Sequence, residues 1–227
     1  LLHYARRILS LHDEAVASLS TEPLSGRIRL GVTEDTTGGG LSRILGRFSR
    51  LQPDIAIQIG VSQSRVIAAQ LDLGEIDVGL IQVFLKDRRS DDITLSEETL
   101  HWVRSPDLTL DWGRPIPFLV FDDNCFHRQW AMDAFPLPPH GFRVVMECGS
   151  IAGILSAVRA GLGVTVLNSR HVASGIEVIT GGFAATPDIA YVIRLGKNAR
   201  STALMSLVRA ITDEAGNARR EAPALAV

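Results

Sequence analysis

The hydrophobic positions from residue 27 onward alternate between the spacing of strands and the spacing of helices. Apolar runs predict strands at 28–32, 55–61 and 78–81, and helical spacing predicts helices at 41–51 and 66–73. Gly74 follows the second helix, where a left-handed cap is expected. Strands that alternate with helices in this way predict a parallel sheet covered by helices.

A second unit of the same kind follows a polar link at residues 86–92. Its predicted elements are apolar runs at 100–103 and 118–121, a helix at 126–134, a strand at 142–147, a helix at 151–160 and a strand at 164–167. A late strand at 189–195 and a helix at 203–215 complete the pattern. The chain is therefore predicted to form two α/β units, and Gly161 again closes a helix.

The first 19 residues have a helical pattern of their own. Leu1, Ile8 and Ala15 recur at intervals of seven, as do Tyr4 and Leu11. This stripe suits a partner helix, and it equally suits a terminal helix packed on its own domain. Because the pattern begins without a capping residue, we expect further sequence upstream.

The composition is that of an ordinary folded chain, with 227 residues, 46% of them hydrophobic, and a formal net charge of -2. That charge predicts no general attraction to nucleic acid. No apolar run approaches the roughly 18 residues that span a bilayer and no secretion signal begins the chain, so we expect a cytoplasmic protein without a membrane partner. Cys125 and Cys148 are expected to be free thiols. The six histidines lack metal-ligand spacing, so we expect no metal and no cofactor.

Three segments, 26–31, 71–80 and 154–167, occur in an order and at a spacing that match a known family over residues 1 to about 215. They read GRIRLG, LDLGEIDVGL and, at 158–167 within the third, VRAGLGVTVL. The chain resembles the effector-sensing half of LysR-type bacterial transcription regulators. The resemblance implies an N-terminal winged helix-turn-helix before a linker helix. That domain is not in this sequence, so we expect a truncated chain that would bind DNA only through the missing domain.

The resemblance also implies an α/β fold of two Rossmann-like lobes with a two-strand hinge, like type 2 periplasmic binding proteins, preceded by a linker helix. The linker and dimerisation helix would be 1–24, lobe I 26–98 together with 186–216, lobe II 99–185, and the C-terminal tail 217–227. A small-molecule effector would bind in the cleft between the lobes. Its occupancy would change the geometry of a homodimer or homotetramer, and no enzyme activity is expected.

Ligands of open α/β sheets sit beyond the carboxyl ends of strands, where helix N-termini and loop amides converge. The candidate effector-binding residues are Thr33, Glu34, Asp35, Thr36, Ser62, Ser64, Phe121, Asp122, Cys125, Gly149, Ser150 and Asn168. Thr33, Ser64 and Ser150 are the preferred polar contacts, with Phe121 as an apolar wall, although ordinary helix caps would occupy the same positions. Glu34 and Asp35 would repel a carboxylate effector and favour an amine-bearing one.

Two other functions compete with effector sensing. A solute-binding protein of a transporter shares the fold, and the upstream sequence decides between a winged helix and an export signal. A thiol redox sensor would depend on Cys125, whose pKa His127 and Arg128 could lower at a helix start. The segment is similar to that of peroxide-sensing members of the family. Ala134 stands where their resolving cysteine is expected, however, which favours a cysteine without redox work.

Enzyme motifs fail on spacing. Residues 148–153 read CGSIAG, in which glycines do not lie two residues on either side of Ser150 as a nucleophile elbow requires. The glycines at 38–40 lack the following lysine and hydroxyl residue of a phosphate-binding loop. We therefore predict no catalytic residue.

Overall fold

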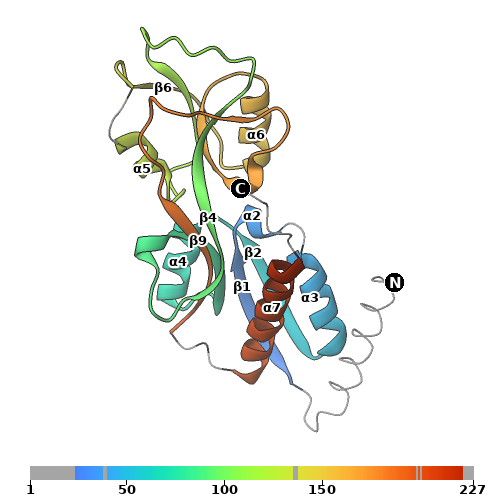
Figure 1. The fold of residues 1–227 in the computed structure, drawn as a ribbon. Coiled ribbons are helices and arrows are strands. Elements are labelled where there is room, and N and C mark those ends of the chain that lie inside the picture. Colours follow the sequence, from blue (N-terminus) through green and yellow to red (C-terminus); the bar gives the residue numbers. More distant parts are fainter. Residues whose placement is uncertain (1–23, 38–39, 135–137, 198, 200, 222–227) are drawn as a thin grey trace, which may run out of the picture.

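Two lobes stacked end to end make up the described part of this computed structural model, which comprises residues 24–37, 40–134, 138–197, 199 and 201–221 (Figure 1). Lobe I, the lower one in the figure, holds the beginning and the end of the described chain. Lobe II holds the middle. The predicted linker helix lies outside the described residues up to residue 23, and the residues at which each lobe was expected to begin and end stay a prediction.

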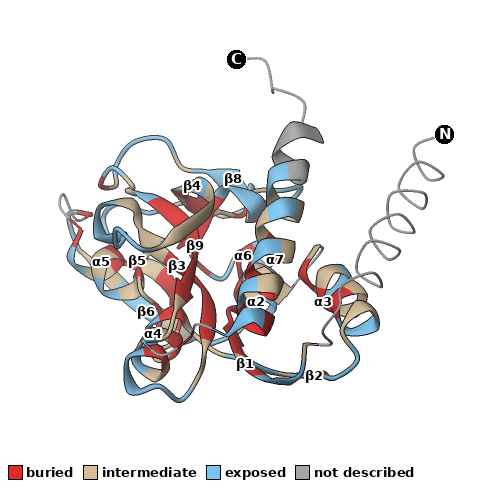
Figure 2. Cartoon of the chain, turned by 90° about the horizontal axis from the view of Figure 1, so that it is seen from below, coloured by how far each residue is buried: buried red, intermediate tan, exposed pale blue. Residues whose placement is uncertain are grey.

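Lobe I is built on the parallel strands β1 (Gly26–Val32), β2 (Ile55–Val61) and β3 (Val78–Phe84), paired in the order β2-β1-β3. Strand β9 (Asp188–Leu195) continues the sheet antiparallel to β3. Helices α3 (Gly40–Leu51) and α7 (Thr202–Glu221) cover one face, and α4 (Ser64–Leu73) covers the other (Figure 2). The parallel sheet covered by helices that the alternating pattern predicts is confirmed.

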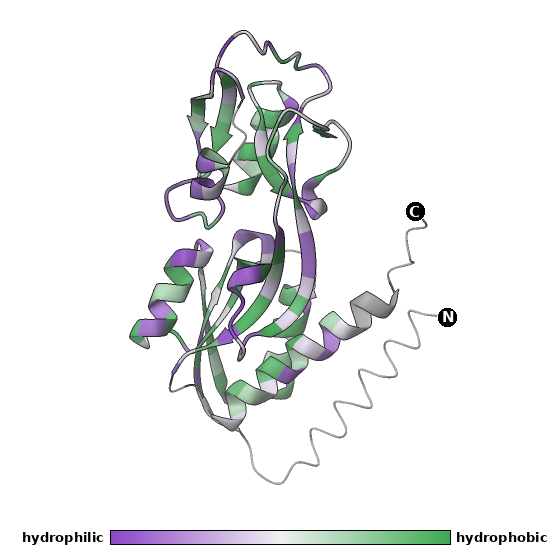
Figure 3. Ribbon diagram, turned by 60° about the vertical axis from the view of Figure 1, so that its left-hand side comes forward, coloured by the Kyte–Doolittle hydropathy of each residue, from purple (hydrophilic) through white to green (hydrophobic). Residues whose placement is uncertain are grey.

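The helices of lobe I pack through apolar stripes. Helix α3 buries Leu41, Leu45 and Phe48, which follow one another at the spacing of a single helical face. Helix α4 packs Ile67 and Leu71 against β3 and β9. Figure 3 shows hydrophobic strands lying behind helices that carry purple, hydrophilic segments. Gly74 ends α4 at a φ of 74°, as predicted for a left-handed cap.

Two antiparallel strands, β4 (Ile93–Arg104) and β9, connect the lobes (Figure 1). Strand β4 pairs with β9 over 93–99 and with β7 (Thr165–Asn168) over 100–103, so one strand serves both lobes. The sequence pattern indicated only its apolar second half, because its first half is only partly buried and carries polar residues. At the lobe I end, Arg194 donates hydrogen bonds of 2.7 and 2.6 Å to the buried carboxylate of Asp92. This ion pair fixes the segment entering β4 to β9.

Lobe II adds the parallel pair β5 (Ile116–Val120) and β6 (Phe142–Glu147), and the short β8 (Glu177–Val178) pairs with β4. Helices α5 (Arg128–Asp133) and α6 (Ile151–Arg159) pack on these strands, and the turn η2 (Ser169–His171) follows β7. The core is aromatic: the Trp102 ring stacks 5.5 Å from Phe142 and 4.8 Å from Phe183. Gly161, at a φ of 72°, closes α6 as predicted.

Three features, two short turns and the length of the last helix, differ from the sequence expectation or add to it. Directly after β1 the chain forms a single helical turn, α2 (Glu34–Thr37), and another turn, η1 (Leu85–Asp87), follows β3. Helix α7 continues to Glu221, so it runs into the segment expected to be the tail. None of the described helices has the length and hydropathy needed to cross a membrane.

Candidate functional site

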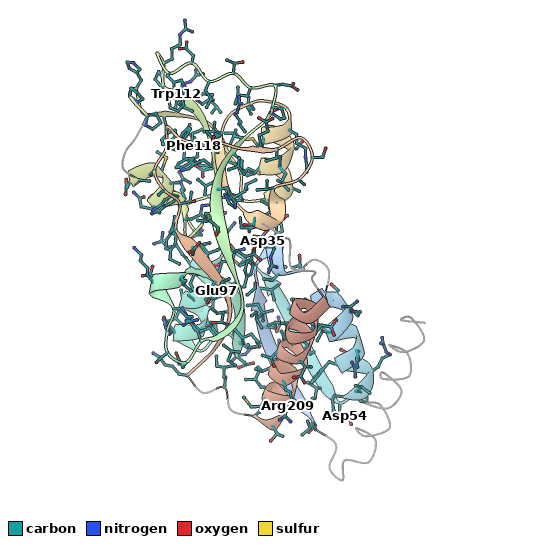
Figure 4. All side chains as sticks on the ribbon, in the orientation of Figure 1. Asp35, Asp54, Glu97, Trp112, Phe118 and Arg209 are labelled. Atoms are coloured by element: carbon teal, nitrogen blue, oxygen red, sulfur yellow. The ribbon has the colours of Figure 1, made fainter. Side chains whose placement is uncertain are left out.

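A cavity of about 230 Å³ lies between the two lobes, and both contribute to its wall. Lobe I supplies the residue after β1, part of α2, the end of β2, the loop before α4, and one residue each of α4 and β3. Lobe II supplies the loop after β5, the start of α6 and the end of β7. Figure 4 shows Asp35 at this level of the molecule. The predicted site residues that line the cavity are Thr33, Glu34, Asp35, Ser62, Phe121, Asp122, Cys125, Gly149 and Asn168.

The carboxylate of Asp35 is the centre of a hydrogen-bond network in this wall. One of its oxygens lies 2.6 Å from His171 Nε2. The other accepts from Asn168 Nδ2 at 3.1 Å and from the Tyr191 hydroxyl at 3.3 Å, and also from Gln82 Nε2. Because an ionised carboxylate only accepts, the His171 Nε2 must carry a proton. Asp35 of lobe I is therefore bound to two residues of lobe II.

This network keeps Asp35 ionised although its side chain is only 13% exposed. Burial raises the pKa of the carboxyl, because it disfavours the charged form. Hydrogen bonds from His171, Gln82 and Tyr191, together with attraction to the His171 ring, outweigh burial and lower the pKa of Asp35 overall. The cavity wall consequently holds a negative charge at neutral pH.

Glu34, the residue before Asp35, makes a second contact between the lobes. Its carboxylate accepts a hydrogen bond of 3.1 Å from the Ser150 hydroxyl and one of 3.0 Å from the Ile151 backbone N–H. These donors stand at the N-terminus of α6, where free N–H groups and the helix dipole favour an anion. A carboxylate from lobe I thus occupies the N-terminus of a lobe II helix.

Gln63 makes a further contact across the cavity, because its side-chain amide donates to the Gly149 carbonyl at 3.0 Å. The apolar part of the wall comes from both lobes. Phe121, at 8% exposed, belongs to it, and its aliphatic members are Val61, Val66, Leu100, Ile151 and Leu167. The cavity is therefore apolar on part of its wall and polar where the lobes meet.

Three predicted site residues do not line the cavity. Ser64 is buried, and its hydroxyl accepts a 3.0 Å bond from the Gln82 backbone N–H, which ties α4 to β3. Thr36 in α2 donates back to the carbonyl of Thr33, the residue before that helix, at 2.8 Å. Ser150 stands at the N-cap of α6, but its hydroxyl is bonded to Glu34 and makes no capping bond.

The idea that Cys125 has a lowered pKa is wrong. Its thiol is buried at 4% exposed, and burial raises its pKa to about 12, despite backbone hydrogen bonds that act the other way. The neighbouring groups supply little positive charge. Burial lowers the pKa of His127 to about 4, and Arg128 is paired with Asp123 and Glu147. Cys125 is a thiol in the cavity wall without the thiolate that redox chemistry needs.

Sequence reasoning missed several polar residues of the site: Gln63, Gln82, His171 and Tyr191. Gln82 carried a signal, because it is the only polar residue within the apolar run of β3. Tyr191 and His171 carried no such signal, because they lie beside Asp35 only once β9 and η2, which are distant from it in the sequence, meet α2 in the folded chain. Within the described residues, no cluster of His, Cys, Asp and Glu could hold a metal ion.

Two α/β lobes, two connecting strands and a cavity between them define a small-molecule receptor fold of the periplasmic-binding-protein type. A family model described as "LysR substrate binding domain" matches residues 21–215, and the chain belongs to this family. The resemblance seen in the sequence is confirmed.

Individual relatives agree with this assignment. The HTH-type transcriptional regulator DgdR of Burkholderia cepacia is 29% identical over 181 residues, which cover 80% of this chain and 61% of DgdR. The regulatory domain of Synechocystis CcmR in complex with 2-PG matches with a TM-score of 0.61 and 19% identity, over 85% of this chain and 99% of that one. The effector binding domain of QuiR in complex with shikimate gives 0.62 and 14%, over 86% and 99%. At such identities the structures show the fold alone.

The chain spans about three fifths of the length of the curated relatives it matches. Those relatives are transcriptional regulators rather than enzymes.

Proposed function

We propose that this chain is the effector-sensing domain of a LysR-type transcription regulator and binds a small molecule in the cavity between its lobes. The observation that carries the proposal is the cavity itself, because residues of both lobes line it and an occupant would touch both. The regulators among its relatives, and the structural neighbours that contain 2-PG and shikimate, support the same function.

The expected response follows from the contacts that already join the lobes. Glu34 and Asp35 reach lobe II from a single turn of helix, so a ligand beside them competes with or reinforces these bonds. A ligand shifts the lobe angle only as far as it binds one arrangement better than the other. We infer that the altered angle reaches a DNA-binding domain through a homodimer or homotetramer, in the cytoplasm and without catalysis.

The effector contacts that we propose are the predicted residues that line the cavity, with Thr33 and Ser62 as hydroxyl partners and Phe121 as the apolar wall. Asn168 acts indirectly, because its amide is already bonded to Asp35 and Tyr191. Cys125 contributes apolar surface.

A thermal-shift screen of small metabolites, followed by calorimetric titration of the hits, tests the proposal. Thr33→Val and Ser62→Ala should each weaken binding by about 5- to 150-fold where the hydroxyl bonds the ligand, since an unsatisfied buried partner costs about 1–3 kcal/mol. Ser174→Ala, an exposed serine outside the cavity, is the control and should bind as the parent does. Unchanged affinity in both cavity variants would place the ligand elsewhere.

A transporter's solute-binding protein remains the rival because it shares the fold. The gene sequence upstream of residue 1 separates the two functions: a winged helix-turn-helix supports a regulator, and an export signal supports transport. The curated relatives favour the regulator.

A further inference from the structure

The ionisable groups that line the cavity are predominantly acidic. Glu34, Asp35 and Asp122 contribute carboxylates, and no lysine or arginine is among the described residues of the wall. His171 faces Asp35, and even a protonated His171 ring would balance only one of these three negative charges. His127 adds no positive charge, because burial holds its pKa at about 4. A ligand in this cavity is surrounded by negative charge in a partly desolvated site, where charge interactions are strong.

The arginines around the cavity have other partners. Arg170 donates to Glu98 at 2.8 Å and lies over the Tyr191 ring. Arg128 is paired with Asp123 and Glu147, and it also donates to the Phe121 carbonyl. Arg65, which is exposed, donates to the Asp123 carbonyl. None of these guanidinium groups reaches the wall.

Two sets of donors that a ligand anion could use are already bonded within the chain. Glu34 takes the Ser150 hydroxyl and the Ile151 N–H, which form the N-terminus of α6. Asp35 takes the side chains of Gln82, Asn168 and His171. An anionic effector would have to displace a carboxylate of the protein from each set.

One carboxylate oxygen of the wall lacks a partner that a cationic donor would supply. Asp122 accepts through Oδ1 from the Asn124 backbone N–H at 2.9 Å, and in the described part of the chain no donor bonds its Oδ2. That oxygen lies against Gly149, where an added Cβ would be only 2.7 Å away. An N–H donor of a ligand would satisfy this oxygen.

We propose that the effector carries a protonated amine, that Asp122 receives this ammonium group, and that Glu34 excludes carboxylates from the cavity. The inference rests on the proposed function and adds the chemical class of the ligand. At about 230 Å³, the cavity is smaller than the roughly 300–1,000 Å³ typical of drug-sized ligands, so the amine belongs to a small molecule. Phe121 and the aliphatic wall receive its apolar part.

Three probes of nearly equal shape test the charge preference: benzylamine, benzyl alcohol and benzoate, titrated calorimetrically into the chain at pH 7. Benzylamine should bind at least about tenfold more tightly than benzyl alcohol, which corresponds to about 1.4 kcal/mol, and benzoate should bind most weakly. The reverse order, with benzoate tightest, overturns the inference and leaves the cavity as a ligand site. Failure of all three probes and of the metabolite screen overturns the proposed function as well.

Two variants assign the roles, each checked first for an unchanged thermal transition. Asp122→Asn should bring benzylamine to within about twofold of benzyl alcohol. The matched control Asp123→Asn, next in sequence, exposed and outside the wall, should keep the parent preference. Glu34→Gln should strengthen benzoate binding by about tenfold, because it releases the donors of α6. Parent-like selectivity in both Asp122→Asn and Glu34→Gln would overturn the assignment.

Discussion

His127 is neutral in the folded chain because its ring is buried, and this makes the stability of the fold depend on pH. Burial lowers its pKa from 6.5 to about 4. Between about pH 6.5 and pH 4, this histidine therefore carries a proton in the unfolded chain but not in the folded chain. The free energy of unfolding is consequently highest above pH 6.5 and decreases as the pH falls through that window. The loss is about 3 kcal/mol at most, at 1.36 kcal/mol per pKa unit.

Urea unfolding at a series of pH values measures this effect. Between pH 7 and 4.5 the free energy of unfolding should fall by about 2–3 kcal/mol in the parent chain. His127→Phe removes the titrating group, and its ring suits the aromatic contacts with Phe121 and Phe126, so this variant should show a much flatter profile. His140→Gln, at an exposed position, is the control and should follow the parent. A parent-like slope in His127→Phe would contradict the assignment.

Among the elements, the approach of β7 to β5 depends on Gly163. A Cβ at this position would lie 2.7 Å from the Pro117 carbonyl oxygen, and that oxygen also accepts a 2.8 Å bond from the Val164 N–H. Backbone atoms cannot rotate away as a side-chain tip can. Gly163→Ala should therefore lower the free energy of unfolding by about 1–3 kcal/mol, as overpacking does.

The control for Gly163 is a glycine in another strand. Gly60 in β2 has no atom within 4 Å of an added Cβ and no positive φ. Gly60→Ala should be neutral or stabilising by up to about 1 kcal/mol, because it restricts the unfolded chain. Urea unfolding of both variants compares them directly. Equal stability of the two alanine variants would show that β5 moves freely away from β7.

Sequence periodicity predicted elements whose burial is one-sided or complete, and it failed where burial is mixed. Helix α3 was found because its apolar face repeats regularly, and β3 because the run is almost wholly apolar. The first half of β4 was missed, since a crossover strand is covered unevenly along its length.

The site shows the same limit. The rule that ligands lie beyond strand ends placed Thr33 and Asp35 at the cavity. It could not show that the Ser64 hydroxyl would accept a hydrogen bond from the Gln82 backbone, or that His171 would face Asp35. These contacts form only where segments distant in the sequence meet.

At the scale of the molecule, the edge of the lobe I sheet predicts self-association. Among the described strands β2 ends the sheet, and its Ile59 is 47% exposed. Together with the predicted stripe of the first 19 residues, this edge should make the chain at least dimeric at tens of micromolar in sedimentation experiments. A strict monomer at that concentration would count against it.

A charged substitution in β2 tests whether this edge of the sheet forms the contact between two chains. Ile59→Arg should raise the dissociation constant by at least about tenfold, because it places an unpaired charge in the contact. Leu73→Arg alters an equally apolar and more exposed side chain, 74% exposed, at the far end of α4. It should associate as the parent does, and a matching loss in both variants would point to a general effect of charge.

The place of β9 in the sheet has a consequence for synthesis on the ribosome. Although it is the last of the described strands in the sequence, β9 lies between β3 and β4 in the sheet order. While translation proceeds, the first strands emerge with an open edge that only a segment made more than a hundred residues later can fill. Lobe II, apart from its connection to β9, is complete by then. Lobe I therefore stays unfinished until β9 has emerged, and that interval is when an exposed strand edge is most open to aggregation or to chaperone capture.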